Sequence, residues 1–276
     1  TVWHTYTQGI YESPDDSMEA GAERKLATAF ASLKLRRGAS LLEVGCGWGG
    51  FSRYCARRGV QVTGITLSKD QKAFAEDQFA AEQLPGELLY QDFFTYAPAG
   101  KFDAVSLMGS IEDLSDYPKV MAQLRRLVRP GGRVYLDFAA AVHPFGTSTF
   151  VTQYVWPGTF RMVYLPELVA AVTKSPFMLV AVHNDRHNYA QWTRLGHERW
   201  VERRQEVVAA SSEETWRLFR LLFAGTAGVM RSPEHDVTAY RVELELPEDL
   251  TQHRRPFELD DVLAGARMAV AGLRVN

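Results

Sequence analysis

Cysteine is scarce in this sequence of 276 residues, which contains only Cys46 and Cys55. Both lie in one predicted turn and helix, so we expect neither a disulfide framework nor a cysteine-based metal site. The histidines also lack metal-ligand spacing with any pair of cysteines or glutamates, and no metal is therefore expected. A reducing, cytoplasmic location fits this composition.

Long apolar runs and a strong excess of one charge are also absent. No run reaches the length of a membrane span, and no basic and then apolar leader is present. A formal net charge of −2 provides no overall field that would attract nucleic acid. We therefore expect neither a nucleic-acid partner nor an integral membrane segment. Since the chain opens at Thr1, we expect its natural start to lie upstream.

Helical and extended patterns alternate over the first 140 residues, in a chain that is 46% hydrophobic and can bury one substantial core. We predict helices at 17–34, 49–58, 68–82 and 117–128, and strands at 40–45, 60–66, 87–91, 102–107 and 133–139, the last after a turn at 130–132. This order predicts an α/β, Rossmann-like fold: a mostly parallel, seven-stranded sheet with helices on both faces. Ligands in such sheets bind at the carboxyl ends of the strands.

The pattern changes after residue 140. Residues 141–175 are rich in aromatic residues, proline and glycine and are not typical of a strand-helix unit, so we interpret them as a lid or substrate wall. A strand near 177–183, helices at about 190–209 and 212–229, and a strand at 237–246 follow. We expect one domain over 1–247, with lid elements at 141–175 and 188–230. Residues 248–276 are expected to form an extension that packs on the body or on a partner, and a homodimer is one option.

A glycine-rich segment after the first predicted strand indicates a cofactor. Gly45, Gly47 and Gly49 let the backbone approach a ligand closely at a strand-to-helix turn. A dinucleotide site would have the spacing Gly-x-Gly-x-x-Gly, whereas this segment has Gly-x-Gly-x-Gly. Glu43 would sit badly beside a pyrophosphate but suits a cationic amino group. The segment therefore predicts S-adenosylmethionine and methyl transfer; the alternative is a glycine-rich turn without a ligand.

The ends of the next two strands continue this pattern. The carboxylate that usually binds ribose is absent at the end of the second strand, and a set of other residues takes its place: Thr66, Leu67 and Gln71. At the end of the third strand, Gln91 and Asp92 supply an acceptor for the adenine amine, and Phe93 supplies an aromatic face. Asp92 taken alone could equally be a turn residue.

Several segments resemble one enzyme family. The residues over 42–49, 64–71 and 91–92 resemble those of the cyclopropane fatty acid synthase and mycolic acid cyclopropane synthase family of S-adenosylmethionine-dependent methyltransferases. Coclaurine-type N-methyltransferases share much of this pattern. The resemblance continues through Thr-Tyr-Thr-Gln at 5–8, Tyr-Val-Trp-Pro-Gly at 154–158, and a series of later positions: His183, Asn184, Tyr189, Thr193 and Trp200.

The resemblance implies a role for each matching position. Tyr6 and Thr7 would close over the cofactor, while the glycines at 45, 47 and 49 would line its methionine end. The ribose side would be held by the residues named above at 66, 67 and 71, and Met108 and Gly109 match the strand end beside the cofactor. Glu112 and Tyr189 match active-site residues, which in the family hold a bicarbonate ion together with a histidine and a cysteine-containing loop. That ion acts as a base.

Three residues depart from the family pattern at this base. Asp113 follows Glu112 where the family has histidine, Asp137 stands where the active-site histidine belongs, and Gln8 replaces the loop cysteine. A second carboxylate near Glu112 would repel bicarbonate unless one of the two were protonated. These departures argue against use of the ion, although it stays an option.

The departures leave several interpretations open. An alkene that accepts a methyl group becomes a carbocation, and Asp137 or Glu112 could remove its proton directly. The enzyme would then methylate carbon, or form a cyclopropane, in an unsaturated acyl, polyketide-like or other natural-product substrate. Alternatively, the carboxylates orient an amine or hydroxyl for N- or O-methylation, and Asp137 could also simply cap the strand end. A further alternative is a cofactor-binding descendant that transfers no methyl group.

Overall fold

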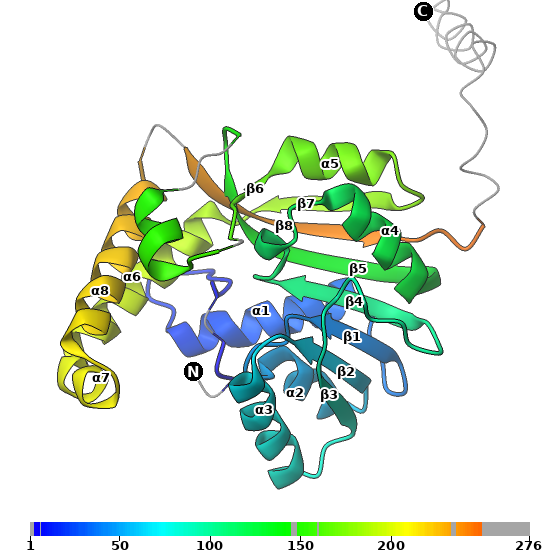
Figure 1. The fold of residues 1–276 in the computed structure, drawn as a ribbon, viewed down its shortest axis with the longest axis horizontal. Helices are drawn as coiled ribbons and strands as arrows, with labels where there is room; N and C mark the ends of the chain where they lie inside the picture. Colours follow the sequence, from blue (N-terminus) through cyan, green and yellow to red (C-terminus); the bar gives the residue numbers. More distant parts are fainter. Residues whose placement is uncertain (1–2, 6, 145–147, 159, 233–235, 250–276) are drawn as a thin grey trace, which may run out of the picture.

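A central sheet organises the protein in the computed structural model, which describes residues 3–5, 7–144, 148–158, 160–232 and 236–249 (Figure 1). Tyr6 and almost all of the expected carboxyl-terminal extension lie outside the described residues. The strand order is β3-β2-β1-β4-β5-β8-β7, with β6 paired to β5 beside this path. The strands are β1 (Ser40–Val44), β2 (Gln61–Thr66), β3 (Gly86–Tyr90), β4 (Phe102–Met108), β5 (Val128–Ala141), β6 (Val163–Tyr164), β7 (Met178–Asn184) and β8 (Val237–Glu245).

The prediction of a mostly parallel sheet is confirmed. The pairs from β3 through β5 are parallel, and β8 runs antiparallel to both of its neighbours, β5 and β7. Seven strands form the continuous path, and the two-residue β6 is an eighth strand that the sequence pattern did not predict. The carboxyl ends of β1, β2, β4 and β5 consequently share one edge of the sheet.

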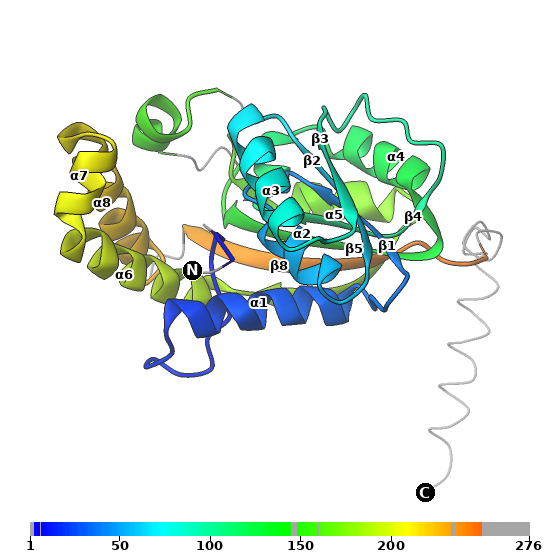
Figure 2. The ribbon, with the colours of Figure 1, turned by 90° about the horizontal axis from the view of Figure 1, so that it is seen from below.

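Helices cover both faces of the sheet, as predicted. The helices α1 (Met18–Ser32), α2 (Gly50–Ala56) and α3 (Lys69–Ala81) pack on one face. On the other face lie α4 (Tyr117–Leu127) and α5 (Leu165–Thr173). Alternate residues of β5 face the two sides: Tyr135 packs in the α1 layer, whereas Val134 and Leu136 pack in the α4 layer. Figure 2 shows α1 and α5 on opposite sides of the sheet.

The helix that follows β2 begins as its sequence predicts. Ser68 is the N-cap of α3, and its side chain accepts a hydrogen bond from the backbone N–H of Gln71. In a capping box, the side chain at the Gln71 position would bond back to the N-cap N–H. Gln71 Oε1 instead accepts from the Thr66 hydroxyl at 3.1 Å, which ties the start of α3 to the end of β2.

The predicted turn at 130–132 is wrong, because these residues lie inside β5. The strand begins at Val128 and shifts its pairing with β4 between Phe102 and Ala104. Gly131 has a φ of +75°, which glycine adopts readily, and its N–H donates to the Leu246 carbonyl at 2.7 Å. The glycine therefore makes an irregularity within the strand rather than a turn before it.

The lid prediction is wrong for the second half of residues 141–175. There β6 and α5 form a strand-helix unit that covers the sheet, and Leu168 and Val172 of α5 are buried in the core. The segment is rich in prolines and aromatic residues, and for this reason the apolar spacing of the nine-residue α5 was not recognised as helical. The first half contains a π-helix, η2 (Val151–Val155), which lies against α8.

Three helices form a separate layer, namely α6 (Arg186–Glu202), α7 (Arg204–Ala210) and α8 (Glu213–Val229), seen at one end of the sheet in Figure 1. The helix predicted at 190–209 starts earlier and is interrupted at Arg203. Trp200 and Trp216 join α6 to α8, since each indole N–H donates to the other residue's carbonyl, at 2.9 and 3.1 Å. Within the described residues, no helix is long and apolar enough to cross a membrane.

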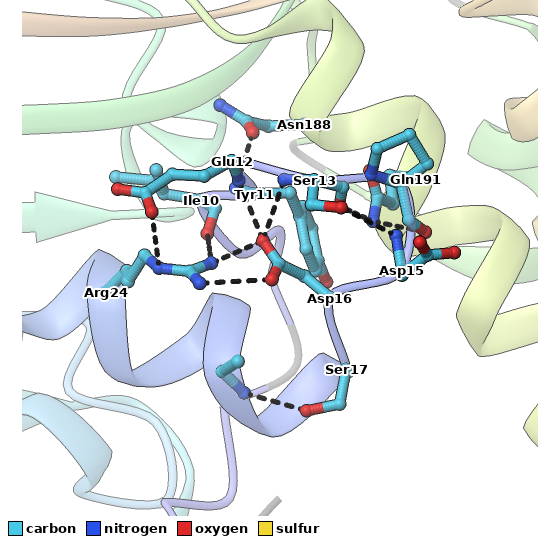
Figure 3. A network of polar contacts seen from close by, with 12 residues as sticks. Ile10, Tyr11, Glu12, Ser13, Asp15, Asp16, Ser17, Arg24, Asn188 and Gln191 are labelled. Atoms are coloured by element: carbon cyan, nitrogen blue, oxygen red, sulfur yellow. Dashed lines mark hydrogen bonds and ion pairs between the residues drawn. The ribbon is translucent and has the colours of Figure 1, made fainter.

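The N-terminal segment, residues 7–17, is held between α1 and α6 (Figure 3). Asp16 receives two hydrogen bonds from Arg24, at 2.6 and 3.1 Å, and further bonds from the backbone of the segment itself. The buried Asn188 on α6 accepts from the Tyr11 N–H at 2.8 Å and donates to Asp185 at 2.8 Å. Gln191 donates to the Ser13 carbonyl at 2.9 Å. These bonds place the segment beside the sheet edge.

Replacing the buried amide should therefore destabilise the protein. We expect Asn188→Ala to lower the free energy of unfolding by about 1–3 kcal/mol, because the buried Tyr11 N–H loses its acceptor. Urea denaturation measures this difference. Gln191→Ala is the control, because water can replace its bond to an accessible carbonyl and its effect should stay below about 0.5 kcal/mol. Equal effects of the two variants would contradict this account of how the segment is held.

Candidate active site

The glycine segment connects β1 to α2 in a conformation that requires glycine. Gly45, Gly47 and Gly49 have φ values of +70°, +54° and +79°. A Cβ atom on Gly45 would lie 2.6 Å from the Cβ of Ser110. These positive angles bring the segment close to the end of β4 and leave its backbone facing a pocket.

That pocket contains most of the residues predicted for the methionine end of the cofactor. Its walls come from the chain before α1, from α1, from the β1–α2 connection and from the end of β4. Among its lining residues are His4, Thr5, Thr7, Lys25, Glu43, Gly45, Gly47, Trp48 and Met108. Gly109 lies next to this wall, and its φ of +67° accompanies a very close approach by Thr7, whose Cγ2 would lie 2.7 Å from an added Cβ.

Glu43 brings a buried carboxyl group to this pocket. It is 4% exposed and accepts a hydrogen bond of 2.5 Å from the Ser52 hydroxyl. Burial raises the pKa of Glu43 to about 7, although the Ser52 bonds and, to a smaller extent, the charge of Lys25 lower it. The group is therefore poised to ionise at neutral pH, and a cation in the pocket would favour its charged form.

The residues predicted for the ribose side meet at the end of β2. Thr66 is buried and accepts from the Ser68 N–H at 3.2 Å in addition to its bond with Gln71. Leu67 exposes 65% of its surface, a large apolar exposure immediately after a strand. An apolar side chain exposed at a strand end is available to cover a ligand.

The three residues predicted for the adenine side lie in different surroundings. Gln91 lies beside the end of β2, because its N–H donates to the Thr66 carbonyl at 3.1 Å. Asp92 caps a turn, since its Oδ1 accepts from two backbone N–H groups at 2.9 and 3.1 Å. The aromatic face predicted for Phe93 is wrong: the ring is 4% exposed and packs in the core beneath α4. The chain turns inward at this position, which strand patterning does not reveal.

Asp137 has a partner that the sequence interpretation missed. It is 1% exposed, its Oδ1 accepts from Gln8 Nε2 at 2.5 Å, and its Oδ2 lies 3.0 Å from Lys25 Nζ. Lys25 is also buried and donates to the Thr7 hydroxyl. The sequence could have indicated that Lys25 is buried, because this residue falls on the apolar stripe of α1 beside Leu26.

Glu112 is the second buried carboxyl group of this region. It lies on the short helix η1 (Ile111–Asp113) after β4, is 5% exposed, and accepts from the Ala139 N–H at 2.9 Å. Its Oε2 is buried and has no hydrogen-bond partner among the residues that the structure describes. Burial, with smaller contributions from the charges of Asp137 and Asp113, raises the pKa of Glu112 to about 8. Asp113 itself is exposed.

Tyr189 comes to the same place from α6. Burial raises the pKa of its phenol above the usual value, and the negative charges of Glu112 and Asp137 raise it further. The ring also contacts Trp192, with 5.4 Å between centroids. The structure thus gathers the four residues predicted as catalytic, Gln8, Glu112, Asp137 and Tyr189, at the carboxyl edge of β4 and β5.

The chain is similar to proteins of one family along most of its length. A family model described as mycolic acid cyclopropane synthetase matches residues 2–240. A probable fatty acid methyltransferase of Mycobacterium tuberculosis is 30% identical over 230 residues, covering 80% of this chain and 53% of that protein. The chain spans about half the length of the curated relatives it matches.

Solved structures share the fold. The cyclopropane synthase MmaA2 from Mycobacterium tuberculosis matches with a TM-score of 0.81 at 22% identity, over 89% of this chain and 91% of that one. The mycolic acid cyclopropane synthase CmaA1, complexed with SAH and CTAB, matches with a TM-score of 0.81 at 20% identity and the same coverage. At these identities the likeness establishes the fold.

Glu112 should make stability depend on pH. Its pKa is raised from 4.5 to about 8, so burial favours the protonated form and the wild type should lose stability as pH rises from 4.5 through about 8. Glu112→Gln cannot ionise and keeps an acceptor for Ala139. We expect the variant to exceed the wild type in Tm by roughly 5 °C or more above pH 8, and by much less below pH 5. Calorimetry across this range measures the difference, and a constant offset would contradict a buried, titrating Glu112.

Proposed function

The chain belongs to the mycolic acid cyclopropane synthetase family, and on this basis we propose that it is an S-adenosylmethionine-dependent methyltransferase that acts at an alkene carbon. The substrate is an unsaturated acyl chain, a polyketide-like chain or another apolar natural product. Either a methylated or a cyclopropane product fits this chemistry. The observation that carries the proposal is Glu112, a buried carboxyl group after β4 that has a raised pKa and one oxygen without a hydrogen-bond partner among the described residues.

The residues present fit S-adenosylmethionine. Glu43 would bind the cationic amino group, and Gly45 and Gly47, which line the pocket, would let the backbone approach the methionine end closely. The side chains at the ends of β2 and β3, namely Thr66, Leu67, Gln71, Gln91 and Asp92, would hold the ribose and adenine. When bound, the cofactor would supply an electrophilic methyl group.

Glu112 is suited to accept the proton that the reaction releases. An alkene that gains a methyl group becomes a carbocation, which loses a proton so that the electrons of the broken C–H bond form a double bond or close a ring. Oε2 of Glu112 can take this proton, because its other oxygen is already fixed by Ala139. Its buried position also limits access by water, which would otherwise capture the cation.

Asp137 is a weaker candidate for the base. Lys25 balances its charge, and Gln8 uses its other oxygen. The same arrangement does not fit bicarbonate, since Asp137 brings negative charge where the family has a histidine. Gln8, at the position of the family's cysteine, already donates to Asp137. We therefore assign the proton transfer to Glu112 without a bound ion.

A row of aromatic rings that begins at Tyr189 supports an apolar substrate. Trp192 stacks edge-on with Phe223 at 5.7 Å between centroids, and Phe223 in turn lies 6.0 Å from Trp200. These rings join α6 to α8 and are only partly buried. Aromatic faces can contact an acyl chain, and they can also stabilise a cation.

Methylation of an amine or hydroxyl is the second candidate. Oε2 of Glu112, which has no partner among the residues described, would accept a hydrogen bond from either group and favour its attack. Incubation with cofactor labelled at its methyl group, together with candidate alkenes, amines and alcohols, separates the two. Label found only on nitrogen or oxygen would reject the carbon chemistry, and cofactor binding without transfer to any of them would favour a descendant that transfers no methyl group.

Loss of the Glu112 carboxylate should abolish turnover without preventing cofactor binding. We expect Glu112→Gln to lower kcat by at least about 100-fold, since a general base contributes on this order. In the wild type, kcat should rise with pH through about 8, because only the ionised carboxyl group accepts a proton. Glu87→Gln, an exposed carboxylate on β3, is the control. Retention of kcat in the Glu112 variant would exclude Glu112 as the base.

Glu43 should make cofactor binding depend on pH. With a pKa near 7, it becomes charged as pH rises, so the Kd for S-adenosylhomocysteine should fall between about pH 5.5 and 7.5. We expect Glu43→Gln to weaken binding about tenfold or more at pH 7.5 and to remove this dependence. Isothermal titration calorimetry measures both effects. A variant that keeps the wild-type pH profile would show that Glu43 does not contact the amino group.

A further inference from the structure

Lys25 is a buried cation in the middle of an apolar helix face. It is 1% exposed, yet two elements far away in sequence converge on its ammonium group. Thr7 accepts from Nζ on one side, and Asp137 Oδ2 lies 3.0 Å away on the other. Burying an ammonium group without partners is very costly. Lys25 therefore holds both Thr7 and Asp137 close to its Nζ.

Gln8 closes this arrangement. Its Nε2 donates to Asp137 Oδ1 at 2.5 Å, so two neighbouring residues of the N-terminal segment reach the same strand of the sheet, one directly and one through Lys25. We call these four residues, Thr7, Gln8, Lys25 and Asp137, the latch. Both residues that the latch takes from the segment lie just before its attachment to α6 at Tyr11.

We propose that the latch fastens the start of the N-terminal segment over the cofactor pocket, with Lys25 and Asp137 as positioning residues. The inference rests on the proposed function, because it takes the ligand of this pocket to be the methyl donor. Asp137 therefore acts through the segment that it holds, and Glu112 alone serves as the proton acceptor.

The position of the latch in the pocket wall supports this role. The pocket is lined by Thr7 and Lys25, together with Glu43 and Met108. Thr7 packs so closely on Gly109 that any side chain there would collide with it. The segment thereby closes the pocket against the end of β4. Lys25 also favours the charged form of Glu43, the form that attracts the amino group of the ligand.

The segment is also held at a second place, which does not depend on the latch. Asn188 binds the Tyr11 N–H, and Asp16 with Arg24 organises the turn that follows. Ile10 is fixed to α1 as well, because its N–H donates to the Gly21 carbonyl at 2.9 Å. Loss of the latch should therefore release residues 7–9 and leave the remainder folded. This separation allows the latch to be tested without unfolding the protein.

The test uses the full chain with Lys25→Met, Asp137→Asn and the double variant. Each single change leaves one buried partner uncompensated, whereas the double variant buries no net charge at this place. We expect the double variant to be more stable than Lys25→Met and to bind S-adenosylhomocysteine about tenfold or more weakly than the wild type by calorimetry. Lys174→Met, which removes an exposed lysine after α5, is the matched control and should bind as the wild type does.

Hydrogen exchange supplies a readout that needs no ligand. In the double variant, amides over residues 7–9 should exchange about tenfold or more faster than in the wild type, while the Ile10 amide bound to Gly21 and the Glu12 and Ser13 amides bound to Asp16 keep their protection. Unchanged exchange over 7–9, or an affinity of the double variant equal to that of a wild type that binds the ligand, overturns the latch. A wild type that does not bind S-adenosylhomocysteine instead rejects the proposed function, and the exchange measurement still decides the latch.

Discussion

Three buried carboxyl groups at the carboxyl edge of the sheet constrain this part of the protein. Glu43 on β1, Glu112 after β4 and Asp137 on β5 each lie within a few percent of complete burial. A buried carboxylate needs an opposite charge or hydrogen-bond donors, and each of the three has a different kind of partner. Asp137 pairs with Lys25, Glu43 accepts from Ser52, and Glu112 accepts from one backbone N–H. Burial raises the pKa values of the two glutamates, and their hydrogen bonds offset it only in part.

These different partners assign different chemistry to similar side chains. Asp137 is ion-paired with Lys25, and its partners connect the sheet to the chain before α1, so it stabilises an arrangement. Glu112 keeps one oxygen unpaired among the described residues, and its raised pKa makes its ionised form a proton acceptor. Glu43 titrates near neutrality inside the pocket of the glycine segment, where a cationic ligand would set its charge.

Two departures from the family pattern, at positions 8 and 137, interact directly with each other. Gln8 and Asp137 are far apart in sequence, yet the amide of one donates directly to the carboxylate of the other. A cysteine at position 8 could not supply this strong donor, and a histidine at 137 would not offer Lys25 a carboxylate. The replacements are therefore understood together, as one internal polar cluster of Gln8, Asp137 and Lys25.

The sequence by itself determined the order of the main strands and helices before residue 140, the glycine segment and the family, because periodicity, capping and turn residues act over short distances. The helix predicted from Ser68 begins there, and the glycines of the β1–α2 connection have positive φ angles, which suit the close backbone approach that was predicted. Only the tertiary structure decided that Phe93 lies in the core, that Lys25 pairs with Asp137, and that one oxygen of Glu112 has no partner within the described part of the chain. Burial and pairing depend on elements that meet after folding, and it is this desolvation that sets the charge and the role of each carboxyl group.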